Sequence, residues 1–298
     1  DGKMSKSRGN VLYADDMVDL FGVDAVRYFL LHEMPFENDG VVSWELLIER
    51  VNSDLANTLG NLLNRTISMS NKYFDGVVTN TDINEDVDDD LKRVVLGARL
   101  RVNICMDKLR VADALTEIWN VFKRCNKYID ETMPWTLGKD PEKQGRLNTV
   151  LYNLIEGITI GASLLEPFMP DTSAAILRQL CTEKRSVTEM GQFGLYPSGN
   201  KVTASPEILY ARIDTEKMLD EIERRFPSKL EEPEEKKPEK KAEPEKTEPA
   251  TVQAREKALL TIDDFDKMQL QIGEVLSCEE IPKSKKLLCS QVQVAGKV

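Results

Sequence analysis

The stretch SWELLIERVNSDLANTLGNLLNR, residues 43–65, decides the fold. Its apolar residues recur at steps of three and four, which places them on one side of an α-helix at about 100° per residue. Ser43 stands directly before them and is a favoured N-cap residue. The pattern predicts a long amphipathic helix that begins near Ser43 and buries one stripe, made of Trp44, Ile48, Val51, Leu55, Leu59 and Leu62.

The rest of this predicted helix is polar. Asn57, Asn61 and Asn64 fall opposite the apolar stripe, and Arg65 lies at the edge of the stripe. Arg65 follows Asn61 by one turn, so the two side chains can contact one object. The helix therefore combines a buried side with a side that is suited to binding.

Further helical patterns flank this segment. Asp24 is placed to cap a short helix that follows Gly22. Two connecting segments separate the helical patterns. Residues 82–90 are predicted to form an acidic turn, and residues 134–143, which begin at Pro134, are predicted to form a loop. The sequence predicts a mainly α fold, a helical bundle with little strand, whose later helices fall at 94–110, 112–133, 147–170, 170–181 and from Thr215 onward.

Composition separates the last part of the chain from the bundle. Residues 227–257 are rich in Pro, Glu and Lys and nearly lack apolar residues, which is typical of a flexible linker. Beyond it, the alternation that includes Val275, Val292 and Val294 favours strands. The predicted parts are 1–40, the bundle 41–226, the linker 227–257, and the start of a truncated β-domain at 258–298.

Overall charge and cysteine usage limit the classes of function. The formal net charge of the 298 residues is −11, so any RNA site must be a local patch. The five cysteines form no C-x-x-C pair and there is one histidine, which favours reduced thiols in the cytoplasm and no metal site. No signal peptide is visible, and no apolar run approaches the ~20 residues of a membrane span.

The first ten residues, DGKMSKSRGN, combine cations with hydroxyl donors. Such a strip suits a polyphosphate, although its composition alone favours an ordinary solvated loop, and it contains no Walker motif. Because no initiator methionine precedes it, we expect the chain to be a piece of a longer protein.

KMSKS at Lys3 to Ser7 resembles the second signature of class I aminoacyl-tRNA synthetases. NSDLANTLGNLLNR at 52–65, YIDETMPWTLGKD at 128–140 and EILYARID at 207–214 resemble the anticodon-binding bundle of the methionyl branch. TIDDFDKMQLQIGEV at 261–275, followed by PKSKKLL, resembles the start of an appended OB-type tRNA-binding domain. The resemblance runs along nearly the whole chain outside the linker and implies that residues 1–40 end a catalytic domain.

The resemblance implies roles for particular residues. Lys3 and Lys6 would stabilise the phosphates of ATP as the loop closes, with Ser5 and Ser7 contributing to ATP binding. Asn61 and Arg65 would hydrogen-bond anticodon bases, and Trp135 would stack on the wobble cytosine. From the residues alone, a packing role between helices is favoured for Trp135. Weaker auxiliary tRNA contacts would come from Lys283, Lys285 and Lys286.

The implied function is that of part of a methionine–tRNA ligase, which attaches methionine to tRNA through methionyl adenylate. The implied partners are ATP with magnesium as its counter-ion, methionine, and tRNA with a CAU anticodon. A homodimer through the complete C-terminal domain is a further expectation. The family's HIGH signature and Rossmann core do not occur in the sequence, so we expect this chain alone to hold no cofactor and to form no adenylate.

Two alternatives of other kinds fit the sequence. One is a stand-alone RNA-binding module without catalysis, which a nucleotide-binding domain upstream of Asp1 would exclude. The other is a class I synthetase for leucine, valine, isoleucine or cysteine. Binding of tRNAs with altered anticodons separates that alternative from the methionyl hypothesis.

Overall fold

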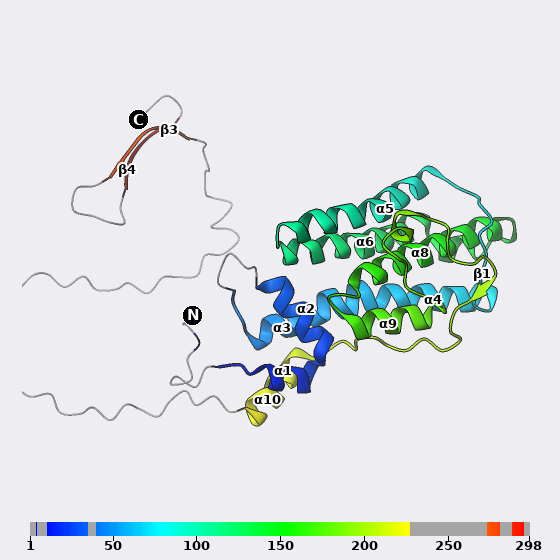
Figure 1. The fold of residues 1–298 in the computed structure, drawn as a ribbon, viewed down its shortest axis with the longest axis horizontal. Helices are drawn as coiled ribbons and strands as arrows, with labels where there is room; N and C mark the ends of the chain where they lie inside the picture. Colours follow the sequence, from blue (N-terminus) through cyan, green and yellow to red (C-terminus); the bar gives the residue numbers. More distant parts are fainter. Residues whose placement is uncertain (1–3, 5–10, 35–39, 227–272, 281–287, 295–298) are drawn as a thin grey trace, which may run out of the picture. The chain divides into compact units, whose positions relative to one another are not determined.

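The computed structural model describes residues 4, 11–34, 40–226, 273–280 and 288–294. These residues lie in two compact units, divided after Glu234. The first is a helical bundle (Figure 1), as predicted. Its helices are α1 (Ala14–Phe21), α2 (Val23–Glu33), α3 (Trp44–Arg50), η2 (Val51–Gly60), α4 (Asn61–Phe74), α5 (Asp86–Asp107), α6 (Val111–Thr132), α7 (Pro134–Leu137), η3 (Pro141–Lys143), α8 (Gln144–Leu165), α9 (Pro170–Gln179), η4 (Glu189–Gly191) and α10 (Thr215–Arg225).

The predicted long helix is confirmed as three consecutive elements, α3, η2 and α4, which run from Trp44 to Phe74. The Ser43 hydroxyl accepts a hydrogen bond of 3.2 Å from the backbone N–H of Leu46, as expected of an N-cap. Of the predicted stripe, Trp44 is half-buried and the other five side chains are buried. The apolar period therefore identified both the helix and the side that it buries.

The middle of this helix, η2, is a π-helix over Val51–Gly60, which the sequence analysis did not predict. The backbone N–H of Asn61 donates to the carbonyl of Ala56, five residues back, and the hydroxyl of Thr58 donates to the carbonyl of Ser53 at 2.9 Å. A hydrogen bond that spans five residues lengthens the turn beyond the 3.6 residues of an α-helix. Residues spaced by four and five therefore come to lie above one another along η2.

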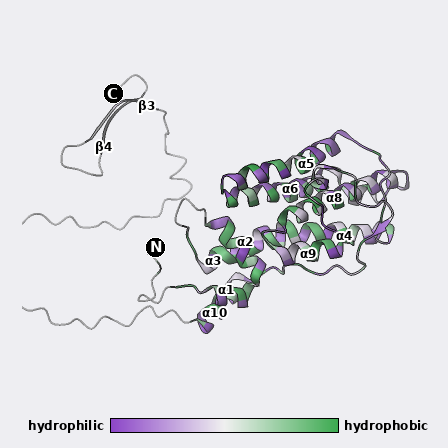
Figure 2. Ribbon diagram, in the orientation of Figure 1, coloured by the Kyte–Doolittle hydropathy of each residue, from purple (hydrophilic) through white to green (hydrophobic). Residues whose placement is uncertain are grey.

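Helix α8 occupies the centre of the bundle, and nearly all of its residues are buried. Along the surrounding helices hydrophobic and hydrophilic residues alternate, as Figure 2 shows for α5 and α6. Two glycines of α8 let neighbours approach closely, because a Cβ at Gly157 would lie 2.9 Å from Cys125 Sγ and one at Gly161 would lie 2.6 Å from a ring carbon of Phe122. Burial raises the pKa of the Cys125 thiol to about 12, so this cysteine is an inert packing residue.

Two predictions at the starts of helices were wrong. The acidic segment 82–90 is not all turn, because α5 already begins at Asp86 with a capping box between Glu85 and Asp88. Asp24 does not cap its own helix; it accepts a 2.6 Å hydrogen bond from the backbone N–H of Thr172 and so caps α9. In both places a carboxylate satisfies a helix N-terminus: the contact is local in the capping box of α5 and tertiary where Asp24 caps α9.

Short strands complete both units. In the bundle, β1 (Val77–Val78) pairs antiparallel with β2 (Asn200–Lys201). In the second unit, β3 (Gly273–Glu280) pairs antiparallel with β4 (Leu288–Val294), with a bulge between Val275 and Ser277. These strands include Val275, Val292 and Val294, as predicted. The OB-type domain stays a prediction, and so do the bounds of the four parts into which the sequence analysis divided the chain. The predicted linker lies outside the described residues.

Candidate functional site

The residues predicted to bind ATP lie outside the described part of the chain. These are Lys3, Ser5, Lys6 and Ser7, and the same holds for the auxiliary lysines Lys283, Lys285 and Lys286. The geometry that can be described is therefore that of the bundle. It concerns Asn61, Arg65 and Trp135.

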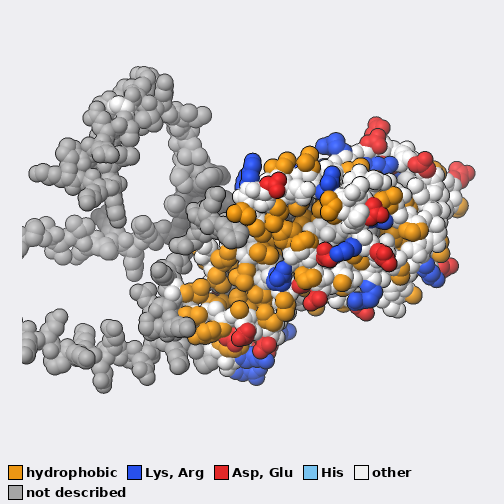
Figure 3. Space-filling view, in the orientation of Figure 1, with side chains coloured by type: hydrophobic (Ala, Val, Ile, Leu, Met, Phe, Trp, Pro, Cys, Tyr) orange, Lys and Arg blue, Asp and Glu red, His pale blue; other side chains and the backbone are white. Residues whose placement is uncertain are grey.

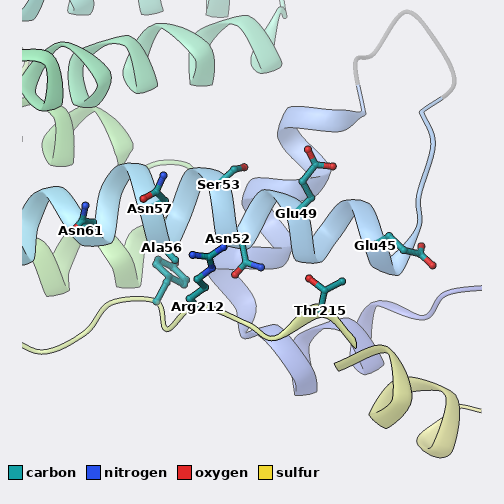
Figure 4. A pocket seen from close by; sticks show the side chains of 10 residues that line it. Glu45, Glu49, Asn52, Ser53, Ala56, Asn57, Asn61, Arg212 and Thr215 are labelled. Carbon is teal, nitrogen blue, oxygen red and sulfur yellow. The ribbon is translucent and has the colours of Figure 1, made fainter. Parts of the chain in front are cut away.

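Asn61 lies at one end of a groove of about 490 Å³ along α3 and η2. Figure 4 shows Asn57 and Asn61 projecting from the same side of the helix, and Arg212 reaching it from the segment that precedes α10. Asn57 and Asn61 are four residues apart and share a side of either kind of helix, whereas the wider π-helical turns of η2 bring Asn52, five residues before Asn57, nearer to that side. The groove is lined by Glu45, Glu49, Asn52, Ser53, Ala56, Asn57, Asn61, Tyr210, Arg212 and Thr215.

Paired hydrogen bonds hold the segment 209–213, which forms the wall of the groove opposite the helix. The side-chain amide of Asn52 donates to the carbonyl of Ile213 at 2.9 Å and accepts from the N–H of Ile213 at 2.8 Å. The hydroxyl of Tyr210 shares a 2.5 Å hydrogen bond with that of Thr172, and burial raises the pKa of this tyrosine. The segment 209–213 is thus attached at two points and keeps Arg212 beside the helix.

Arg65 lies one turn beyond Asn61 on α4, as predicted. Its guanidinium Nη2 is 3.9 Å from Oδ1 of Asp130, near the end of α6. The Asp130 side chain is 71% exposed and that of Arg65 34%, so the ion pair is open to solvent and weak. Arg65 therefore remains free to exchange Asp130 for hydrogen bonds to a partner.

The prediction that Trp135 lies in a loop was wrong. Trp135 belongs to the short helix α7. Met133 precedes it with φ of 44°, a left-handed conformation that ends α6 and turns the chain, and Pro134 then starts α7 and is buried. The Trp135 side chain is 42% exposed, in contrast to Trp119, which is 2% exposed. Its ring is therefore accessible to an aromatic partner from solvent.

The structure connects these residues through two features, an ion pair of Arg65 and the groove that Asn61 lines. The Arg65–Asp130 contact places α4 beside the end of α6, five residues before Trp135. Asn57 and Arg212, which the sequence analysis did not single out as binding residues, line the same groove as Asn61. The signal for Asn57 was its position on the polar side of the helix, whereas nothing in the local pattern placed Arg212 beside it.

The described residues contain no group of three or more His, Cys, Asp or Glu side chains that could hold a metal ion. Among the described helices, none is both long and apolar enough to cross a membrane. The chemistry offered by this part of the molecule is therefore amide and guanidinium hydrogen bonding with one exposed indole ring, which suits the edges and faces of unstacked bases.

Comparison with known proteins agrees with this chemistry. Residues 1–67 match the family described as tRNA synthetases class I (M), and residues 78–231 match the anticodon binding domain of methionyl tRNA ligase. A methionine–tRNA ligase of Caldanaerobacter subterraneus subsp. tengcongensis is 45% identical over 100% of this chain and 44% of its own length. One of Clostridium perfringens is 42% identical over 99% of this chain and 43% of its own length.

Solved structures give the same relationship. Mycobacterium tuberculosis methionyl-tRNA synthetase bound by methionyl-adenylate has a TM-score of 0.66 and 38% identity, over 70% of this chain and 42% of that one. Its free form has a TM-score of 0.64 and 36% identity, over 68% and 41%. The chain thus spans less than half the length of the relatives that it matches. It belongs to the methionyl-tRNA ligase family of class I tRNA synthetases and contains the family's anticodon-binding domain.

Proposed function

We propose that this chain is part of a methionine–tRNA ligase and supplies both its KMSKS loop and the recognition of a CAU anticodon. The observation that carries the proposal is the family match over 78–231 together with relatives named methionine–tRNA ligase that align with 99–100% of the chain. The whole reaction joins methionine to ATP with release of pyrophosphate and then transfers the methionyl group to tRNA. ATP, with magnesium as its counter-ion, is a substrate of this reaction.

In the proposed RNA site, each side chain meets a different part of an unstacked base. The amide of Asn61 both donates and accepts hydrogen bonds, and the guanidinium of Arg65 donates several, so the two suit base edges. The exposed ring of Trp135 suits the face of the wobble cytosine. Asn57 and Arg212 are placed to contact nucleotides next to the one that Asn61 binds.

Binding of anticodon stem-loop hairpins tests this proposal. We expect this chain to bind a CAU hairpin more tightly than one whose wobble cytosine is changed, and Trp135→Ala to remove most of the difference, because one stacked base contributes about 1–3 kcal/mol. Asn61→Ala is expected to weaken binding, whereas Asn64→Ala, an exposed neighbour that does not line the groove, is the matched control. Equal affinity of the unmodified chain for both hairpins would contradict the proposal.

At the ATP end, we propose that Lys3 and Lys6 stabilise the charge that develops on the phosphates, with Ser5 and Ser7 as hydrogen-bond donors. In a protein of the relatives' full length, Lys6→Ala is expected to lower methionine-dependent pyrophosphate exchange by about 10²–10³-fold, the usual effect of removing one such group. Binding of the CAU hairpin should stay unchanged in this variant. An unchanged exchange rate would exclude the role of Lys6.

We also propose that residues 258–298 begin an OB-type tRNA-binding domain, whose complete form supports a homodimer of a cytoplasmic enzyme. The antiparallel pairing of β3 with β4 is compatible with such a domain. Lys283, Lys285 and Lys286 would then contact tRNA phosphates. Replacing the three lysines together by Gln is expected to weaken tRNA binding and reduce its salt dependence, without changing the preference for CAU.

A further inference from the structure

The corner between α6 and α7, residues 130–138, carries Trp135 and is in contact with α4 at two points. On one side, Asp130 at the end of α6 lies 3.9 Å from Arg65. On the other, Gly138 at the end of α7 lies directly against the ring of Tyr73, two turns beyond Arg65 on the same helix. Trp135 stands between these two contacts in sequence. The ion pair is weak and open to solvent, so the Tyr73–Gly138 contact is the support that α4 gives to the chain.

Gly138 is a glycine because of space and not because of backbone conformation. Its φ of −67° and ψ of −13° are open to every amino acid. A Cβ at this position, however, would lie 2.6 Å from Cζ and 2.9 Å from Cδ1 of Tyr73, and closer still to Cε1. Any larger residue must therefore displace either the Tyr73 ring or α7.

Neither partner is free to move without cost. Tyr73 is half-buried against the hydrophobic core, and the ammonium group of Lys72 lies 5.0 Å from the centre of its ring. Helix α7 is closed by a 2.9 Å hydrogen bond from the N–H of Gly138 to the carbonyl of Pro134. The amide of Gln144 donates to the carbonyl of Asp140 at 3.1 Å and so attaches the segment after Gly138 to α8.

The chain that enters the corner is held equally firmly. Tyr128, near the end of α6, donates its hydroxyl to the fully buried Asp88 and accepts a 3.2 Å hydrogen bond from Asn153. The hydroxyl of Thr132 donates to the carbonyl of Tyr128 at 2.7 Å. The position of Trp135 is therefore set on its N-terminal side by the bundle, and the Tyr73–Gly138 contact sets it on its C-terminal side.

We propose that Gly138 and Tyr73 are positioning residues, which hold the Trp135 ring in place for a base before RNA arrives. This inference rests on the proposed stacking role of Trp135. A ring that is already fixed loses little conformational entropy on binding, which raises affinity without a new contact. Displacement of α7 by a side chain at 138 should therefore act on base discrimination through Trp135.

The test measures the affinity ratio of this chain for a CAU hairpin and for one with the wobble cytosine changed. Gly138→Ala is expected to lower this ratio by about fivefold or more, the factor that corresponds to about 1 kcal/mol of base stacking. Tyr73→Ala, which removes the support without crowding, is expected to have the same effect. Tyr73→Phe keeps the ring and should preserve the ratio, as should Gly97→Ala, where a Cβ meets only the flexible end of Arg101.

The same changes in a Trp135→Ala background separate this inference from the proposed function. If Gly138 acts through the indole ring, Gly138→Ala should change the ratio by less than about twofold in that background. Two outcomes would overturn the positioning role and leave the stacking role intact. One is an affinity ratio that is preserved in both Gly138→Ala and Tyr73→Ala; the other is a ratio that these changes lower equally with and without Trp135. If Trp135→Ala itself leaves the ratio unchanged, the stacking role fails and the positioning role fails with it.

Discussion

Asp88 is a fully buried carboxylate that joins α5 to α6 and α8. Arg146 of α8 donates to both of its oxygens, at 2.7 and 2.8 Å, and the backbone N–H of Glu85 donates at 2.8 Å. Burial by itself would raise the pKa of Asp88, but the hydrogen bonds from Arg146, Tyr128 and Glu85 outweigh it and hold the pKa below its usual range. The group is therefore ionised at neutral pH and fully compensated.

Replacement of Asp88 by Asn is expected to destabilise the bundle by about 3–5 kcal/mol at pH 7, because it removes the buried counter-charge of Arg146 and leaves only the exposed Glu85, 3.3 Å away, to pair with it. Since the pKa of Asp88 is depressed in the folded state, its contribution is present above the unfolded pKa near 4 and is lost as pH falls through the folded value. Urea unfolding between pH 7 and pH 3 measures both effects. The unmodified protein should lose more stability below pH 4 than the variant does.

Asp90, a carboxylate on the surface of the same helix, is the control for this prediction. Its pKa is lowered by hydrogen bonds from Arg124 and Arg93, but the group is exposed to solvent. Asp90→Asn should therefore change stability much less than Asp88→Asn. Similar losses in the two variants, or parallel acid profiles for Asp88→Asn and the unmodified protein, would show that the buried network is not the source of the acid sensitivity.

At the scale of elements, η2 shows what the sequence could and could not predict. Val51, Leu55 and Leu59 follow one another at steps of four, which satisfies an α-helix and a π-helix equally well. The π form is accompanied by a distant contact that the local sequence does not specify, the 2.9 Å hydrogen bond from Asn126 of α6 to the carbonyl of Thr58. The period therefore predicted the helix, its buried side and the shared polar side of Asn57 and Asn61, but not that Asn52 lines the same groove.

Helix α7 is a second element whose prediction failed for a physical reason. Pro134 stops α6, since it lacks the N–H that the helix requires, and the sequence therefore favoured a loop. The same proline has a fixed φ that suits the first position of a helix, and the left-handed Met133 supplies the turn between the two. The result is a helical support for Trp135 that local preferences alone do not distinguish from a loop.

Asn52→Ala is expected to destabilise the protein by about 1–3 kcal/mol, because the backbone of Ile213 loses both a donor and an acceptor. The segment beside η2 should also become more sensitive to trypsin at Arg212. Equilibrium unfolding and limited proteolysis measure these effects. The matched control is Asn57→Ala, an exposed neighbour on the same wall without a side-chain hydrogen bond among the described residues, which should stay within about 0.5 kcal/mol. Equal stability of the two variants would contradict the prediction.

At the scale of the whole molecule, a net charge of −11 has to coexist with the proposed binding of a polyanion. On the side shown in Figure 3, basic and acidic side chains intermingle over the bundle without a large patch of one sign. Near the proposed site several cations have acidic partners, as Arg65 has Asp130 and Lys143 has Asp140. Composition predicts that any RNA site must be local, and this stays a prediction. Only the resemblance pointed to Asn61, Arg65 and Trp135, because chemistry at so few residues leaves no compositional signal.

This charge distribution predicts a shallow salt dependence for binding of the CAU hairpin to this chain. Lys72, whose ammonium lies 5.0 Å from the centre of the Tyr73 ring, forms no ion pair within 4.0 Å among the described residues, so it can contact a phosphate. Each phosphate neutralised on a single strand contributes about −0.7 to the slope of log K against log salt, so two or three give roughly −1.5 to −2. Lys72→Gln should reduce the slope by about 0.7, whereas Lys184→Gln, at a distant ion pair with Glu166, should not. A slope steeper than about −4 would mean that phosphate contacts, and not base contacts, dominate the affinity. Cations outside the site proposed for Asn61, Arg65 and Trp135 would then have to make those phosphate contacts.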